Sequence, residues 1–471
     1  MTKTFETYFE KAFHHAVDFR KTVEDNQPLP KASHEELYES LGGPLPDAGE
    51  KGDVLIDHLA KYATPGILQM SHPQFYGWVT GSSHPVGVAA DWLTSAWGQN
   101  TGMYVATPAA SVVEDVVGEW VVGLLGLPKE SSVGFVTGAT VANFVGLAAA
   151  RSEVLRRVGW DVEEDGLWGA PKIHVFIGED AHATVYSGLQ YLGMGRNQVI
   201  KIKADINGRM NPEELDRALL EYKGPKIVIA QAGQINSGCF DPFDAIVPLC
   251  KREGAWLHVD GAFGLWANAS PKLKHLSKGV EGADSWATDG HKWLQIPYDC
   301  GFVIVKDHVA HQRAMKIQAS YLHGEIAGRR DPSQFVPELS RRARGFAAWA
   351  VLRAFGRGGV INMVENHCAL AKRLEKNLGK ISGIEVLNDV VLNQLAVGFG
   401  QGLSAEIQDK LTLSVLKKLS EKNECVVGGA DWKGRWIMRI SVITFLTTKG
   451  TIDEFSKMIE CAFKEVKESI L

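Results

Sequence analysis

Short apolar runs alternate with helix-like segments through the middle of the chain, between about residues 130 and 310. The runs cover residues 135–136, 172–177, 198–202, 226–230, 256–259 and 301–305. Such alternation is typical of βαβ units and predicts an α/β fold built on a mostly parallel sheet. Beyond about Arg344 the pattern changes to a long helical stretch, and a mixed α+β tail follows it.

Two helices have recognisable signals. Asn211 can cap the helix expected after residues 198–202, Pro212 suits its first position, and Glu214 lies where a capping box places an acid. Near the start of the chain, apolar residues from Phe5 onward recur at helical spacing and predict a docked amphipathic helix. Charged residues interrupt that segment, so it lacks the apolar core of a secretion signal.

Charged residues are almost absent between Tyr62 and Val113, where Asp91 is the only Asp, Glu, Lys or Arg. Repeated prolines and glycines would break a spanning helix, so we expect no membrane insertion. A soluble chain usually buries such a segment in its core, in a subunit interface or in a deep pocket. The polar Ser, Thr, His, Gln and Asn residues mixed into it favour the interface or the pocket.

Composition narrows the range of partners. The 471 residues include 50 Lys and Arg against 55 Asp and Glu, and the net charge of −5 without a basic run argues against a nucleic-acid partner. The six cysteines are scattered without a Cys-x-x-Cys pair, so we expect neither a disulfide framework nor a metal site. Together with the missing secretion signal, this predicts a cytoplasmic protein. The 49 glycines suggest many tight turns and close backbone approaches.

Four polar features lie at the ends of predicted strands, where open α/β sheets bind ligands. The small-residue turn 137–140 opens a helix and suits an anion such as phosphate, while His182, Asp260 and Lys292 each lie just beyond a strand. Each feature also has a purely structural explanation. The turn could bind no ligand, and His182 could be a capping or core residue. Asp260 could bond to backbone amides, and Lys292 could be an ordinary surface lysine. Together they are what pyridoxal phosphate requires, because an amine binds its aldehyde and a carboxylate keeps its ring nitrogen protonated.

With these motifs the sequence resembles the pyridoxal-phosphate-dependent group II amino-acid decarboxylases, which include the aromatic-L-amino-acid and glutamate decarboxylases. The resemblance covers most of the chain, from His72-Pro73 to Arg439-Ile440-Ser441. Its most specific matches are Asp180-x-His182, His258-Val259-Asp260-x-Ala262, and His291-Lys292-Trp293 followed by Asp299-Cys300.

The resemblance implies a role for each matching residue. Lys292 would form the Schiff base with the cofactor, and Asp260 would pair with the pyridinium nitrogen. His182 would stack on one face of the ring, and Ala262 would pack on the opposite face. The phosphate would be contacted by Ala139, Thr140 and His291.

The resemblance also implies an architecture and an activity. The fold would be fold type I, the aspartate-aminotransferase type, in a homodimer with active sites at the interface. Residues 1–110 would wrap onto the partner, residues 111–345 would form the large cofactor-binding domain, and residues 346–471 a small α+β domain. The implied reaction is decarboxylation of an L-amino acid, preferably aromatic, to the amine and CO₂.

Substrate contacts are expected from the segment 75–80, which corresponds to the substrate side of the aromatic decarboxylases. It contains Trp78 and Thr80, and Tyr104 is near in sequence. The alternative is that these aromatic residues only form the core of the dimer. No basic residue lies in the segment to pair with a side-chain carboxylate, although Arg329 or Arg330 could supply one.

Two smaller departures from the family pattern concern turns beside the expected cofactor site. Many relatives have Asn-Pro before His-Lys, where this chain has Asp289-Gly290, which we interpret as a turn variant. Where aromatic decarboxylases have a run of threonines, this chain has Gln234 and Asn236, which could replace those contacts to the ring oxygen or substrate.

The third departure concerns the lid expected between Tyr321 and Arg341, for which Gly324 and Gly328 are suitable. In aromatic decarboxylases this loop bears a tyrosine that returns a proton to Cα, but residues 322–340 contain no Tyr here. Tyr321 or His323 at the start of the loop, or a group from elsewhere in the protein, could donate the proton instead.

Relatives without that tyrosine can let oxygen react and form an aldehyde, which is the alternative outcome. Carbon–carbon lysis on the same fold is a further alternative. The intact lysine, aspartate and histidine argue against a non-catalytic scaffold.

Overall fold

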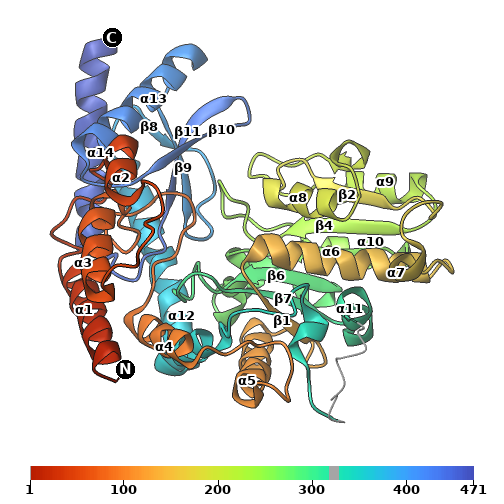
Figure 1. Cartoon of the computed structure of the whole chain (residues 1–471). Helices are drawn as coiled ribbons and strands as arrows, with labels where there is room; N and C mark the ends of the chain where they lie inside the picture. The colour runs from red at the N-terminus through yellow and green to blue at the C-terminus, as the bar shows by residue number, and fades with distance from the viewer. Residues whose placement is uncertain (1, 318–327) are drawn as a thin grey trace.

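Two β-sheets organise the chain in the computed structural model, which describes residues 2–317 and 328–471 (Figure 1). The strands of the large sheet are β1 (Ser132–Val136), β2 (His174–Gly178), β3 (Ile200–Ile202), β4 (Lys226–Gln231), β5 (Trp256–Asp260), β6 (Ser285–Asp289) and β7 (Gly301–Val305). Their order is β1-β7-β6-β5-β4-β2-β3, and only β7 runs antiparallel to its neighbours. The predicted mostly parallel α/β sheet is confirmed.

Helices cover both faces of the large sheet. The helices of this part are α5 (Pro108–Leu125), α6 (Ala139–Arg156), α7 (Val162–Asp165), α8 (Ala183–Tyr191), α9 (Pro212–Glu221), α10 (Phe243–Arg252) and α11 (His308–Met315). Alternate residues of β7 point to opposite faces: Phe302 lies in the core shared with α5 and α10, and Val303 in the core shared with α6, α8 and α11. Apart from the edge strand β3, the strands are almost wholly buried on both faces and therefore read as continuous apolar runs.

The C-terminal part is a smaller antiparallel unit. Its strands are β8 (Ile384–Val386), β9 (Gln394–Phe399), β10 (Gly428–Trp432) and β11 (Arg435–Ser441), in the order β10-β11-β9-β8. Its helices are α13 (Ala405–Lys422) and α14 (Lys449–Ile470). The long helix α12 (Gly345–Leu378) is kinked at Gly356 and contributes side chains to both the large and the small core, so it connects the two sheets.

The N-terminal helices α1 (Thr2–Lys21), α2 (His34–Leu41) and α3 (Gly52–Ala63) lie beside the C-terminal unit (Figure 1). Lys11 and His15 of α1 bind Asp57 of α3. The predicted N-terminal helix is therefore present, but its apolar side chains, such as Phe9, remain exposed in the single chain.

The charge-poor span runs inward after α3 and then forms α4 (Pro85–Trp97). Phe75 and Tyr76 are fully buried, and Tyr76 stacks on Phe455 of α14 with ring centroids 4.1 Å apart. These two aromatic residues are therefore core residues of this chain rather than surface. Gly81 lies against the backbone of Lys292 so closely that a Cβ there would collide with it.

The start of α9 agrees with the sequence signals except at one residue. Asn211 caps the helix by accepting hydrogen bonds from the backbone nitrogens of Glu213 and Glu214. The Glu214 carboxylate does not close a capping box; it accepts from the backbone nitrogen of Lys203, 3.2 Å away, because that strand end lies within its reach. None of the helices in the described part of the chain is long and apolar enough to cross a membrane.

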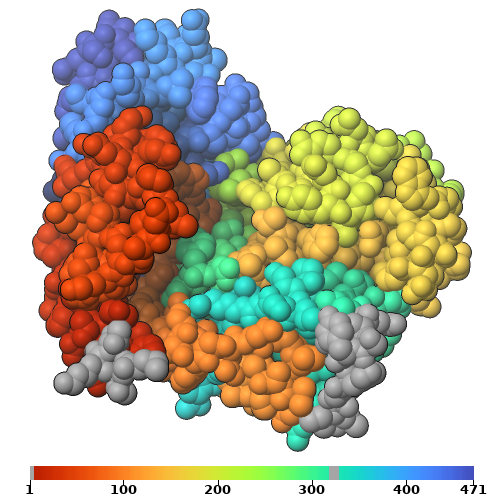
Figure 2. Space-filling view, in the orientation of Figure 1, coloured from red at the N-terminus to blue at the C-terminus, as the bar shows by residue number. Residues whose placement is uncertain are grey.

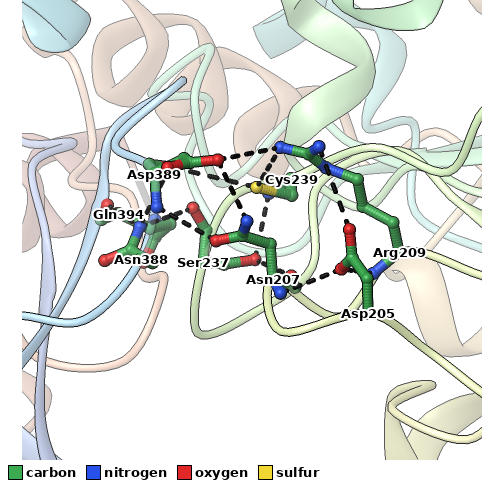
Figure 3. A network of polar contacts seen from close by, with 8 residues as sticks. All are labelled: Asp205, Asn207, Arg209, Ser237, Cys239, Asn388, Asp389 and Gln394. Carbon is green, nitrogen blue, oxygen red and sulfur yellow. Dashed lines mark hydrogen bonds and ion pairs between the residues drawn. The ribbon is translucent and has the colours of Figure 1, made fainter.

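A polar network joins the two sheet units on one side (Figure 3). Asn207 and Asp389 exchange two hydrogen bonds of 3.0 Å, and Arg209 lies 3.4 Å from the Asp389 carboxylate. Asn388 donates to the carbonyl of Ser237 at 2.9 Å. The molecular surface is hollowed between the C-terminal elements and the segments around α8 (Figure 2).

Candidate active site

A cavity of about 320 Å³ opens at the carboxyl ends of the parallel strands. It is lined by all seven residues predicted to contact the cofactor: Ala139, Thr140, His182, Asp260, Ala262, His291 and Lys292. The remaining lining residues are Val79, Thr137, Gly138, Thr184, Gly233, Ile235, Phe263, Asp289 and Tyr298. Residues spread over more than 200 positions in the sequence thus meet at one edge of the sheet, as expected for a doubly covered α/β sheet.

Asp260 ends β5 at the base of the cavity and is almost completely buried. Burial raises the pKa of its carboxyl, while the charges of His182 and Lys292 lower it. One carboxylate oxygen accepts from the backbone nitrogen of Ala262 at 3.2 Å. A buried carboxylate is costly without a positive partner, and a protonated ring nitrogen would supply one.

His182 both caps a helix and lines the cavity. Its Nδ1 lies 2.7 Å from Thr184 Oγ1 and also accepts from the Thr184 backbone nitrogen at the start of α8. Desolvation lowers the pKa of the imidazole, and the charge of the nearby Asp260 opposes this effect. A planar ring held by its cap is suited to stack on a flat cofactor.

Lys292 follows β6, and its Nζ lies 2.9 Å from the Asp289 carboxylate. The other Asp289 oxygen accepts from the backbone nitrogen of Ala139 at 2.6 Å and lies 3.5 Å from His291 Nε2. Asp289 is thus more than a turn variant, because it links the lysine to the first turn of α6. In the sequence, the signal for this contact with Lys292 is a carboxylate three residues before the lysine.

The turn at the start of α6 is closely packed around the backbone. A Cβ on Gly138 would lie 2.9 Å from His291 Cε1, and a Cβ on Gly301 would lie 2.5 Å from Gly138 Cα. Glycine at both positions therefore leaves room beside the helix start, where backbone N–H groups favour anions. This space, the buried Asp260 and the accessible amine fit pyridoxal phosphate.

The sequence comparisons point the same way. The chain matches the profile described as the pyridoxal-dependent decarboxylase conserved domain over residues 35–399. The chain belongs to this family. It is a pyridoxal-phosphate-dependent amino-acid decarboxylase, a carboxy-lyase.

Its relatives differ in the activities for which they are named. The decarboxylase is 26% identical to an aromatic-L-amino-acid decarboxylase of Bacillus atrophaeus, over 92% of this chain and 90% of that protein. It is 28% identical to a phenylacetaldehyde synthase of Arabidopsis thaliana, over 94% and 92%. It is 30% identical to an acidic amino acid decarboxylase of Bos taurus, over 75% of this chain and 68% of the relative.

The solved structure of Oryza sativa TDC with PLP and tryptamine superposes on the decarboxylase with a TM-score of 0.92. The superposition covers 99% of this chain and 98% of that chain at 23% identity. The fold is therefore fold type I, as the resemblance implied.

The expected substrate residues are placed less centrally. Trp78 is half exposed and its neighbour Val79 lines the cavity instead, while Thr80 lies close enough to Tyr298 to lower the pKa of its phenol. Tyr104 lies outside the lining, where its ring contacts Arg329. Tyr321, His323 and Gly324 lie outside the described residues, so the substrate contacts stay predictions.

Arg330 does not reach toward a substrate in this structure. It is partly buried, lies 3.2 Å from Asp115, and donates to the carbonyl of Val133. The suggestion that it could bind a side-chain carboxylate therefore fails, because Asp115 and Glu114 already hold its charge.

The Gln234 side chain has a structural role beside the cavity. The Gln234 side-chain oxygen accepts from the backbone nitrogens of Asn236 and Ser237, at 2.6 and 3.0 Å. This bonding shapes the loop whose residues Gly233 and Ile235 line the cavity. Neither Gln234 nor Asn236 is among the lining residues.

The residues near the cavity that were not singled out from the sequence include Tyr298 and Arg439. Tyr298 lines the cavity and stacks on His291 with ring centroids 4.2 Å apart. Arg439 of β11 is close enough to His182 for its charge to lower the pKa of the imidazole. Its Nε is buried and has no hydrogen-bond partner among the described residues. Within the same residues, no group of three or more His, Cys, Asp or Glu is placed to hold a metal ion.

Proposed function

We propose that the decarboxylase acts on aromatic L-amino acids and releases the amine. The observation that carries this proposal is the charge of the cavity lining. Among its lining residues in the described part of the chain, Lys292 is the only lysine or arginine. A substrate with a side-chain carboxylate would need a further cation, whereas Val79, Ile235 and Phe263 offer apolar surface to a ring.

Pyridoxal phosphate, when bound, supplies the electron sink that lets the bond from Cα to the carboxylate break. Lys292 would hold its aldehyde end, and Asp260 would keep a proton on its ring nitrogen. His182 would pack flat on the ring and exclude water. Arg439 would orient the substrate by binding its α-carboxylate. This role is supported by the buried Nε of Arg439, which has no hydrogen-bond partner among the described residues.

The phosphate end would be held by Ala139, Thr140 and His291, and Ala262 would pack on the face of the ring opposite His182. Support comes from their common place in the cavity lining. The N-terminus of α6 adds backbone donors and a favourable dipole to this end.

The Cα proton donor that we propose is Tyr298, because this residue lines the cavity and carries a hydroxyl group. Burial, and secondarily the charge of Asp289, raise the pKa of this phenol to about 12, so it stays protonated at neutral pH. Trp78, Thr80, Tyr104 and His323 remain proposed substrate contacts.

Aldehyde formation is the second candidate. It is favoured by the 28% identity to a phenylacetaldehyde synthase and by the absence of Tyr in residues 322–340. The deciding experiment is a screen of L-amino acids with mass-spectrometric product identification, with and without oxygen. Amines from aromatic substrates in both atmospheres support the first candidate. Aldehyde with peroxide and ammonia, formed only in oxygen, supports the second; products from acidic amino acids alone contradict both.

We further propose a cytoplasmic homodimer in which residues 1–110 form much of the interface and residues 111–345 and 346–471 form the large and small domains. Support for the dimer comes from exposed apolar side chains in the first segment, among them Phe5, Phe9, Phe13, Trp92 and Trp97. Support for a reducing compartment comes from the six free cysteines.

A further inference from the structure

The Gln295 side chain is fully buried three residues after Lys292, where the loop beyond β6 meets two other segments of the chain. Its Nε2 donates to the carbonyls of Lys292 and Trp293, each at 3.1 Å, and to the carbonyl of Ile443 at 2.8 Å. Its Oε1 accepts from the backbone nitrogen and from the hydroxyl of Ser82, at 3.0 and 2.5 Å. A single amide group therefore bonds to all three segments.

The orientation of this amide follows from backbone groups whose roles are fixed. A backbone N–H can only donate, so the amide atom that faces the nitrogen of Ser82 must be the oxygen. A backbone carbonyl can only accept, so the amide atom that faces Lys292, Trp293 and Ile443 must be the nitrogen. Its two hydrogens serve three carbonyls, so one hydrogen is shared between two of them. Both polar atoms of the buried side chain are thus satisfied in one orientation.

The backbone of Gln295 is held by contacts of its own. Its φ of 58° lies in the left-handed region, which residues other than glycine rarely adopt. Its nitrogen donates to the Lys292 carbonyl at 3.3 Å, and its carbonyl accepts from the backbone nitrogen of His84 at 2.8 Å. A conformation of this kind persists where the surrounding contacts over-determine it, which is common at functional sites.

Each of the three joined segments carries a residue of the site. The first carries Lys292 itself. The second carries Val79, which lines the cavity and lies three residues before Ser82. The third carries Arg439, which lies four residues before Ile443. The place of the lysine relative to the two other segments therefore depends on the junction at Gln295.

We propose that Gln295 is a positioning residue that holds the backbone of Lys292 in a fixed place relative to Val79 and to the end of β11. The ion pair with Asp289 directs the amine of Lys292, whereas Gln295 fixes the backbone from which that side chain extends. Gln295 is not among the lining residues, so it acts through Lys292. This inference rests on the proposed role of Lys292 toward pyridoxal phosphate and deepens it.

The test measures how fast the full chain, freed of cofactor, captures pyridoxal phosphate, before any turnover. The readout is the rate at which the visible band of the bound cofactor appears after mixing, with Lys292→Ala as the blank. Gln295→Met keeps the length of the side chain and removes its five hydrogen bonds. Because a small displacement of a reacting group is costly, we expect this rate to fall by about tenfold to a hundredfold.

The matched control is Gln408→Met in α13. Gln408 also bridges two segments, because its amide donates to the Leu403 carbonyl at 2.8 Å and accepts from Arg435 at 2.7 Å. It lies outside the cavity lining, so its loss should leave the rate of capture unchanged. A reduced rate in this control as large as that in Gln295→Met would overturn the inference.

Gln295→Glu separates positioning from packing, because glutamate is close to glutamine in size. Burial among carbonyls keeps a carboxyl group protonated, so this side chain can still accept from Ser82 and donate one hydrogen bond. We expect its rate of capture to lie between those of wild type and Gln295→Met. A lower melting temperature without a change in rate in Gln295→Met would show that Gln295 only stabilises the fold, and would overturn the inference.

If Gln295→Met does not fold, Gln295→Gly takes its place. Glycine adopts the left-handed backbone freely, and water can occupy the vacated polar space. We expect the same loss of rate, and a wild-type rate in Gln295→Gly overturns the inference. A wild-type protein that binds no pyridoxal phosphate would instead overturn the proposed function.

Discussion

Asp289 brings a negative charge to the end of the cavity formed by α6, where it binds Lys292 and the backbone of Ala139. Asp289→Asn would keep an acceptor for the Ala139 nitrogen and remove the charge that repels a phosphate. We therefore expect pyridoxal phosphate to bind about threefold to tenfold more tightly, as measured by absorbance titration. Asp453→Asn, which removes the same charge far from the cavity, should have no effect. Unchanged or weaker binding in Asp289→Asn would contradict a phosphate beside Ala139.

Tyr298 is the second residue whose side chain can be tested alone. Tyr298→Phe removes the hydroxyl and keeps an aromatic ring to stack on His291, so cofactor affinity should stay at the wild-type value. Because the proposed proton donor is lost, amine formation should slow by about a hundredfold and the share of aldehyde should rise. Products are identified by mass spectrometry. An unchanged rate of amine formation would mean that the proton comes from another group.

Helices α6 and α11 are joined by a charged cluster that gives a pH-dependent contribution to stability. Glu153 of α6 accepts from Arg156, Arg157 and Arg313, at 2.7 to 3.0 Å. Its burial opposes ionisation, but the bonds from these three arginines outweigh it and hold the pKa of Glu153 at about 2.

The direction of the pH effect follows from this depressed pKa. The contribution is fully present above the unfolded pKa of about 4.5 and is lost as the pH falls toward about 2. We expect Glu153→Gln to lower the free energy of unfolding at pH 7 by about 1–2 kcal/mol, since Arg156 and Arg157 are partly exposed and screened by water. Its stability should also change less than that of wild type between pH 5 and pH 2 in chemical denaturation. Parallel curves for the two proteins would contradict the interpretation.

Several parts of these elements could be predicted from the sequence because their signals are local. Strand ends, the cap at Asn211 and the anion turn depend on neighbouring residues, and in a parallel sheet strand ends meet at one edge. The partners of buried polar atoms depend on packing instead. Asn143 has no local signal, and it meets His258, 115 positions away, only because α6 packs on β5. Likewise, the sequence allows Arg330 to reach a substrate, because it does not show that Asp115 packs beside Arg330 in the folded chain.

At the scale of the whole molecule, the exposed apolar surface of the N-terminal segment predicts a dimer. Phe9 is 60% exposed and Phe13 is 47% exposed, although both lie on a well-formed helix. Burying such side chains is worth about 1.5–3 kcal/mol each. We expect a dimer in sedimentation velocity experiments and a shift toward monomer in Phe9→Asp. A wild-type monomer at micromolar concentration would contradict the proposed assembly.

The central claim is that the cavity at the strand ends holds pyridoxal phosphate through Lys292. The most direct test is to load the protein with the cofactor, treat it with borohydride, which fixes a carbon–nitrogen double bond between an aldehyde and an amine, and map the adduct by peptide mass spectrometry. We expect the phosphopyridoxyl mass on the peptide containing Lys292, and no adduct at the cavity in Lys292→Ala. An adduct on a different lysine, or none on the loaded wild type, would contradict the account.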